Sequence, residues 1–472
     1  MMRGNISSGF TLNISIVIIV SIFDSSILFA QPTIRNPSFE NFQPIVSLTS
    51  INTMNNYNRG GETIQNAQNN IIAVGANASD IIKQSQSNAL RQMGVKVPGQ
   101  TANQSKELNE IRSESHRALD VRQKNIEHFS NYFKLLEQLN PDSFSITKAV
   151  YLSEAAFYDK PFTYDDFEKT IKQVSGFVKK ILTAEGLDEK NNVAANYAIQ
   201  KLYQQDNIVH DDESHKDIVL KKLQYDFDDY NGEKDWSKMF VTKILQTGSG
   251  QCHSLPLLYL CLAEQLHAKA YLSLAPNHSF IEYFDEKNRR YNYETTNGNL
   301  VTQTWLMQST YVNATAIKNK TYLDTLSSRK LYAQCLADFL QGYLVKVGYD
   351  NISDRITNKI LSVDSTNITA LMLQANLYNY VFQIKLKKAG MPPPEDYTKY
   401  PELSQAYEAR KIAIAKVQET GFQEMPEEAY RQWLQSLNEE KRKQESKLEQ
   451  EKIAREIKKI KAKKSTFSNM KN

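Results

Sequence analysis

The sequence predicts an α+β protein in which one apolar helix and a small antiparallel sheet are embedded in largely helical modules. Apolar side chains recur at the spacing of one helical face over residues 255–266. Three segments then alternate apolar and polar residues in the manner of strands, at residues 269–275, 278–284 and 290–295. Helical modules are predicted at residues 116–215 and 320–425 on either side, so residues 216–310 form the predicted core unit. The first module has predicted helices at about residues 126–139, 146–157, 164–182 and 191–203. The second has them at 328–347, 352–361 and 366–383, before a proline-rich break at residues 391–401.

Cys252 stands at the predicted start of the apolar helix, directly after the Gly-Ser-Gly turn of residues 248–250. Pro256 supports this placement, because a proline in the first turn of a helix loses only an amide that has no partner there. The positive end of the helix dipole and the unpaired amides favour the thiolate, which is the reactive form of cysteine. The pattern predicts a cysteine placed for nucleophilic chemistry.

His278 and Glu294 belong to the second and third predicted strands. If the intervening turn centres on Glu286, His278 falls directly opposite Glu294, and such pairs have Cβ atoms about 4.5–5.5 Å apart. A carboxylate at that position orients an imidazole and stabilises its charged form. A register slip of one residue would place Glu294 on the other face of the sheet.

The segments GQC, NHSFIEY and YNYETTNG, within about residues 222–305, resemble the bacterial transglutaminase-like superfamily. The resemblance implies a papain-like core in which Cys252 is the nucleophile, His278 the general base and acid, and Glu294 the third member of a triad. Aspartate is more usual in the family at the position of Glu294. An aromatic residue often follows the histidine directly, whereas Ser279 stands there in this chain.

The family also implies an oxyanion donor close to the cysteine. Trp236 and Gln246 precede the Gly-Ser-Gly turn and are the side-chain candidates, and the backbone amide of Cys252 is a third. The alternative for Trp236 is ordinary packing in the core. The sequence does not choose among them.

The resemblance implies a cysteine acyl-transfer enzyme that acts on amide bonds of a protein or peptide substrate through a thioester. Water as acceptor would make it a peptidase or amidase, and an amine would make it a cross-linking enzyme. Nothing in the sequence marks an amine site, which favours hydrolysis. No cofactor and no metal are expected, because the acidic loop at residues 210–215 lacks a second group of ligands. The alternative is a catalytically inactive binding or scaffold protein that uses its helical modules to contact a protein partner.

Residues 1–30 have the plan of a signal peptide, with Arg3, an apolar run at residues 12–23 and Ala30 at the expected cleavage site. The alternative is an uncleaved anchor, although the run is short for a bilayer span of about 20 residues. The sequence predicts export from a bacterial cell to the periplasm or the medium, with no stable membrane span after signal removal. A formal charge of +4 indicates no bulk attraction to nucleic acid.

Three further features complete the predicted organisation. Residues 31–115 are rich in Asn, Gln and Ser and are expected to be mostly flexible, with one or two helices at most. Residues 362–378 resemble one tetratricopeptide-like junction within the second helical module. Residues 426–472 form a charged helix and tail whose apolar positions do not keep a heptad, which favours a solvated helix over a coiled coil.

The chain has three cysteines. Cys252 and Cys261 stand nine residues apart on one predicted helix, about 13 Å along its axis, so they cannot form a disulfide. Pairing of Cys261 with Cys335 remains open. A free Cys252 in an oxidising compartment fits a thiol kept for chemistry.

Overall fold

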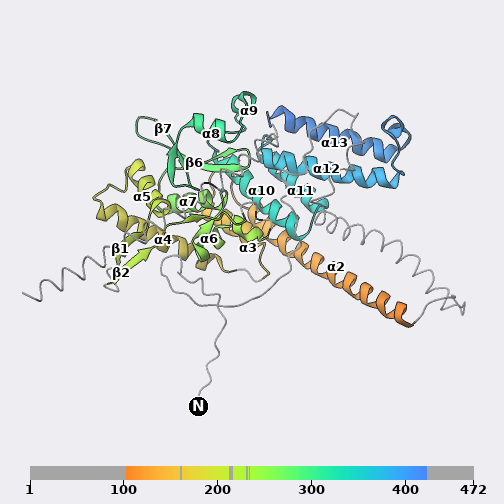
Figure 1. Cartoon of the computed structure of the whole chain (residues 1–472), viewed down its shortest axis with the longest axis horizontal. Coiled ribbons are helices and arrows are strands. Elements are labelled where there is room, and N and C mark those ends of the chain that lie inside the picture. Colours follow the sequence, from red (N-terminus) through yellow and green to blue (C-terminus); the bar gives the residue numbers. More distant parts are fainter. Residues whose placement is uncertain are drawn as a thin grey trace, which may run out of the picture.

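The computed structural model describes residues 102–159, 162–211, 216–229, 232, 234–422 and 439. Within these residues the chain is helix-rich and carries small, mainly antiparallel sheets, which confirms the predicted α+β class (Figure 1). Among the described helices, none has both the length and the apolar character that crossing a bilayer requires. The predicted signal peptide and most of the polar segment that follows it lie outside the described residues.

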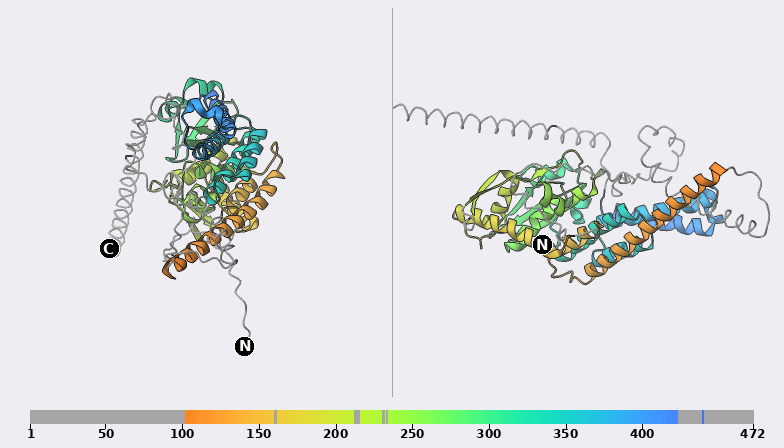
Figure 2. Two further views of the ribbon diagram at one scale, coloured as in Figure 1. Left: turned by 90° about the vertical axis from the view of Figure 1, so that its right-hand side faces the viewer. Right: turned by 90° about the horizontal axis from the view of Figure 1, so that it is seen from below.

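Four helices precede the sheet: α2 (Ala102–Glu137), α3 (Ile146–Ala155), α4 (Tyr164–Ala184) and α5 (Asn192–Gln204). Three of them agree closely with the predicted elements. The sequence allowed one or two helices within residues 31–115, and α2 begins inside that range, at Ala102. Residues 102–115 contain three Glu and one each of Ala, Lys, Leu and Arg, all of which favour helix. Figures 1 and 2 show the N-terminal part of α2 extending past the other described elements.

Two glutamates tie the central helices together at their N-termini. The carboxylate of Glu264 in α7 (Ser254–Gln265) accepts hydrogen bonds from the first two backbone amides of α3, each at 3.0 Å. The carboxylate of Glu154 in α3 accepts hydrogen bonds from the first two backbone amides of α6 (Val241–Thr247), at 2.6 and 2.9 Å. Each carboxylate therefore satisfies donors that a helix N-terminus would otherwise leave without partners.

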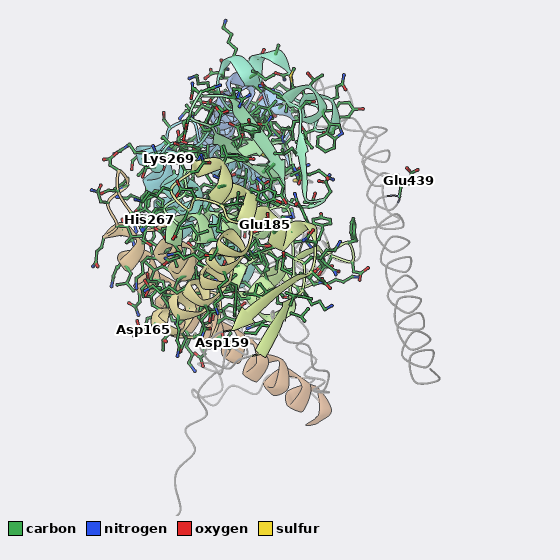
Figure 3. The ribbon with its side chains drawn as sticks, turned by 90° about the vertical axis from the view of Figure 1, so that its left-hand side faces the viewer. Asp159, Asp165, Glu185, His267, Lys269 and Glu439 are labelled. Carbon is green, nitrogen blue, oxygen red and sulfur yellow. The ribbon has the colours of Figure 1, made fainter. Side chains whose placement is uncertain are left out.

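Helix α7 lies at the centre of the molecule. Every side chain from Ser254 to Ala263 is buried, so the helix packs on all sides and not on one face alone. It contacts α3, α4, α5 and α6 and the first two strands of the main sheet. The connection from α7 to that sheet carries His267 and Lys269, which are labelled in Figure 3.

The main sheet has four antiparallel strands in sequence order: β5 (Tyr271–Ala275), β6 (His278–Phe284), β7 (Arg290–Glu294) and β8 (Asn299–Val301). The first three confirm the predicted strands, and β8 was not predicted. One face packs Leu272, Ile281 and Tyr293 into the same core as α7. The other face places Ala275 and Phe280 in a second core.

The turn between β6 and β7 is longer than predicted, and the predicted register is wrong. Glu282 pairs with Asn292, which places Glu294 opposite Phe280 and not opposite His278. The two extra turn residues are accommodated because the Asp285 carboxylate accepts hydrogen bonds from the amides of Lys287 and Arg289 at 2.9 and 2.8 Å. The residue of β6 opposite Glu294 is therefore two positions along the strand from His278. Because side chains alternate between the two faces, His278 and Glu294 remain on the same face, as a diagonal pair.

Two smaller strand pairs lie before α7. Strands β1 (Asn207–Asp211) and β2 (Lys216–Leu220) form an antiparallel hairpin where the sequence indicated only a polar link. Strand β3 (Gln224–Tyr225) pairs in parallel with β4 (Ser249–Gly250), which is part of the predicted Gly-Ser-Gly turn. The short helix η2 (Trp236–Met239) lies between β3 and α6.

The rest of the described chain is helical: α8 (Gln303–Ser309), α9 (Ala314–Lys318), α10 (Ser328–Lys346), α11 (Asn351–Val363), α12 (Ile368–Lys388), η3 (Pro394–Lys399) and α13 (Pro401–Glu419). Helices α10 to α12 confirm the predicted elements, whereas α13 was not predicted. Helix α13 packs along α12, and both contribute to the second core. Apart from Glu439, the predicted charged helix lies outside the described residues.

Candidate active site

Cys252 lies in the turn that joins β4 to α7. Helix α6 ends at Gly248, whose φ of 71° is the left-handed conformation that glycine adopts without strain. The amide of Leu255 donates to the carbonyl of Gln251 at 3.0 Å, so helical hydrogen bonding begins around Cys252 although α7 itself starts at Ser254. Cys252 was predicted to lie in the first turn of the helix. It stands two residues before the first residue of α7, still at the helix N-terminus.

Cys252, His278 and Glu294 come together at the edge where β6 begins and β7 ends. The imidazole Nε2 of His278 lies 2.5 Å from the Oε2 atom of Glu294. Cys252 also acts on this imidazole and helps to raise its pKa, and Nδ1 is the ring nitrogen that does not face the carboxylate. The histidine thus stands between a thiol and a carboxylate.

The charges of His278 and Glu294 support each other in a buried setting. Burial disfavours the imidazolium, yet the Glu294 carboxylate and Cys252 outweigh it and raise the pKa of His278 well above its usual value. Burial also opposes ionisation of Glu294, but the charge and hydrogen bond of His278, with hydrogen bonds from Thr296, lower the pKa of that carboxyl. Glu294 is only 1% exposed, and its second oxygen accepts from the amide and hydroxyl of Thr296 at 3.0 and 2.8 Å.

The β5–β6 turn holds the cysteine from the side of the sheet. Asn277 has a φ of 56°, and its backbone carbonyl accepts from the Cys252 thiol at a sulfur–oxygen distance of 3.7 Å. Ser279 stands where the family often has an aromatic residue, and its hydroxyl donates to the carbonyl of Cys252 at 2.7 Å. The residue next to the histidine therefore fastens β6 to the cysteine turn, a role that the sequence did not indicate.

Gln251 fastens the same turn on its other side and was also missed by sequence reasoning. Its side chain is fully buried, and its amide nitrogen donates to the carbonyls of Asp226 and Asp229 at 3.0 and 2.7 Å. The loop that these carbonyls belong to leads into η2 and Trp236. In the sequence, the only sign of this role was the position of Gln251. A polar side chain directly before a buried helix needs a hydrogen-bond partner.

The oxyanion candidates occupy different environments. Trp236 is 6% exposed, and its indole Nε1 is buried without a hydrogen-bond partner among the described residues. Gln246 is exposed in the last turn of α6. An oxyanion donor acts in a site that excludes water, so exposure disfavours Gln246. The buried donor of Trp236 and the backbone amide of Cys252 are the stronger candidates.

All three cysteines are free, so the Cys261–Cys335 pairing that the sequence left open is not formed. Cys261 and Cys335 are buried, and that burial is the main cause that raises the pKa of each thiol well above its usual value. Cys252 is the only one of the three that is partly exposed. The described residues contain no group of three or more His, Cys, Asp or Glu side chains arranged to hold a metal.

Comparisons with known proteins do not supply a family. No protein-family model and no curated protein matches the chain. Among solved structures, the chain is similar to menin in a crystal structure that reveals its binding site for Mixed Lineage Leukemia (MLL) protein. That similarity has 10% identity and a TM-score of 0.28, and it covers 62% of this chain and 70% of menin. Similarity at this level carries no information on function.

Proposed function

We propose that the chain is a cysteine acyl-transfer enzyme with a transglutaminase-like core, in which Cys252, His278 and Glu294 form the catalytic triad. One observation carries the proposal: the imidazole Nε2 of His278 lies 2.5 Å from a buried carboxylate, and the same imidazole is acted on by the thiol at a helix N-terminus. Nucleophile, base and orienting acid in this order are the arrangement that activates cysteine for acyl transfer.

The chemistry begins with transfer of the thiol proton to Nδ1 of His278. The sulfur of Cys252 then attacks an amide carbonyl carbon, a carbon–sulfur bond forms, and the carbonyl electron pair moves to the oxygen. The amide of Cys252 and the indole Nε1 of Trp236 are the proposed donors to that oxyanion. When the carbon–nitrogen bond breaks, His278 returns its proton to the leaving amine and a thioester remains.

The thioester is resolved by a second nucleophile. In hydrolysis, His278 takes a proton from water, the oxygen attacks the thioester carbon, and the carbon–sulfur bond breaks to release a carboxylic acid and the thiolate. An amine in place of water would give cross-linking. We favour hydrolysis of a protein or peptide substrate outside the cytoplasm, because no feature of the sequence marks a second site for an amine.

The proposal predicts the pH dependence of Cys252 alkylation in the wild-type protein. An ordinary thiol reacts with iodoacetamide about fiftyfold more slowly at pH 6.5 than at pH 8.5, because only the thiolate reacts. With His278 as proton acceptor, the rate at Cys252 should differ by less than about threefold between these two pH values. Mass spectrometry of the modified peptide, with Cys252→Ser as background, measures it. A difference of about fiftyfold, as for an ordinary thiol, would instead favour the inactive scaffold.

The diagonal register predicts that the length of Glu294 matters. Glu294→Gln should slow alkylation of Cys252 at pH 6.5 by about tenfold, because the imidazolium loses its anion. Glu294→Asp should slow it almost as much, since the shorter side chain withdraws the carboxylate by about 1.5 Å from a diagonal partner. Glu286→Gln, in the exposed turn of the same hairpin, is the control. Full reactivity of Cys252 in Glu294→Asp would contradict the inference that the carboxylate needs the length of a glutamate side chain to reach His278.

A further inference from the structure

The residue after the proposed nucleophile contacts the second helical module. His253 is the N-cap residue of α7, and its Nε2 atom lies 2.9 Å from the Oδ2 atom of Asp338 in α10. The two side chains are only 22% and 13% exposed. The pair therefore joins the cysteine turn to a helix that lies far along the chain.

The groups around this pair favour a charged histidine. Asp338 accepts from Nε2 of Gln334 through its other oxygen at 2.9 Å, so both carboxylate oxygens have partners. Glu154 of α3 also acts on His253. Burial opposes the imidazolium, but Asp338 and Glu154 together raise the pKa of His253.

The pair acts on a turn whose residues are fixed in several directions. Gln251 is bound to the loop before η2, and the hydroxyl of Ser254 accepts from the amide of Gln251 at 2.9 Å and donates to the carbonyl of Lys238 at 3.0 Å. Ser279 holds the carbonyl of Cys252 from the sheet. His253 adds an ion-pair contact with Asp338 of α10 on a further side of this turn.

We propose that His253 and Asp338 are positioning residues for the Cys252 thiol, and that they couple its reactivity to the packing of α10. This inference rests on the proposed function. His253 directly follows Cys252 and is the N-cap residue of α7, so an imidazolium there adds positive charge to the helix N-terminus that carries the thiol. Positive charge near a cysteine favours its thiolate. Asp338 acts through His253 by keeping that ring charged and in place.

The test compares alkylation of Cys252 by iodoacetamide in wild type, Asp338→Asn and His253→Gln between pH 6 and 9. Both variants should react about fivefold more slowly than wild type at pH 6.5 and approach it near pH 9, where even an unassisted thiol is largely ionised. Asp142→Asn is the matched control. Asp142 forms an exposed ion pair with Arg329, which lies in the first turn of α10, the helix that carries Asp338.

Thermal unfolding of each variant shows whether it remains folded. Rates equal to the control at every pH, or a slowing by one constant factor from pH 6 to 9, would overturn the inference, since a purely structural change has no reason to follow the charge of His253. The two proposals fail separately. The wild-type profile alone tests the function, whereas the ratio of variant to wild type tests the positioning pair.

Discussion

The His278→Ala variant should alkylate Cys252 about a hundredfold more slowly than the wild-type protein at pH 6.5. Without the imidazole, the thiol has no proton acceptor within the site, and Glu294 remains as an anion whose field disfavours a second negative charge nearby. At pH 9 an unassisted thiol is largely ionised, so the rates of the two proteins should converge. The measurement is the rate of modification of the Cys252 peptide across this pH range.

His267→Asn provides the control for removing a histidine from the same unit. His267 is exposed, lies between α7 and β5, and has a φ of 54°, which asparagine tolerates. Its rate profile should match that of the wild type. Equal rates in wild type and His278→Ala at pH 6.5 would remove His278 from the proposed triad. Cys261 and Cys335 are buried and should stay unmodified while the protein is folded.

The sequence predicted the central unit well because its elements are set by local patterns. The apolar repeat of α7 and the alternation of β5, β6 and β7 survive in the structure with nearly the expected bounds. The predicted cross-strand register was wrong, since it depends on how many residues the turn at Asp285 accommodates. The pairing of His278 with Glu294 survived that error because a two-residue shift of partner leaves both side chains on one face.

Other features could not be read from periodicity. The β1–β2 hairpin is short and polar, so its alternation is weak, and α13 follows a proline-rich segment that suggested a break. Gln251 and His253 have partners that are distant in sequence, in the loop before η2 and in α10. A sequence pattern indicates that such residues are polar and near a core, but only the packed chain shows which groups they face.

Glu282→Gln should make the free energy of unfolding less dependent on pH. Glu282 lies in the middle of β6, on the same face as His278, and is only 1% exposed. Its Oε2 atom lies 3.7 Å from Nε of Arg290. Burial raises the pKa of this carboxyl to about 7, while Arg290 and Ser273 oppose the rise and Asp324 adds to it. The folded protein therefore holds the proton more tightly than the unfolded chain does.

The sign follows from that difference. Below pH 4.5, the usual value, Glu282 is protonated in both states and its contribution to stability is fully present. Between pH 4.5 and about 7 the unfolded chain ionises while the folded protein keeps the proton, so stability falls as pH rises. Glutamine does not titrate. From pH 5 to pH 8, the stability of the variant relative to wild type should therefore increase by about 2–3 kcal/mol.

Denaturant unfolding of both proteins at pH 5 and pH 8 measures this change. Glu154 also has a pKa raised to about 7 by burial, but it is present in both proteins, so its effect cancels in the difference. Glu286→Gln, on the exposed turn beside the same strand, should show no such increase. If wild type and Glu282→Gln lose stability in parallel between these pH values, Glu282 is ionised in the folded protein at pH 5. Its contact with Arg290 would then outweigh its burial.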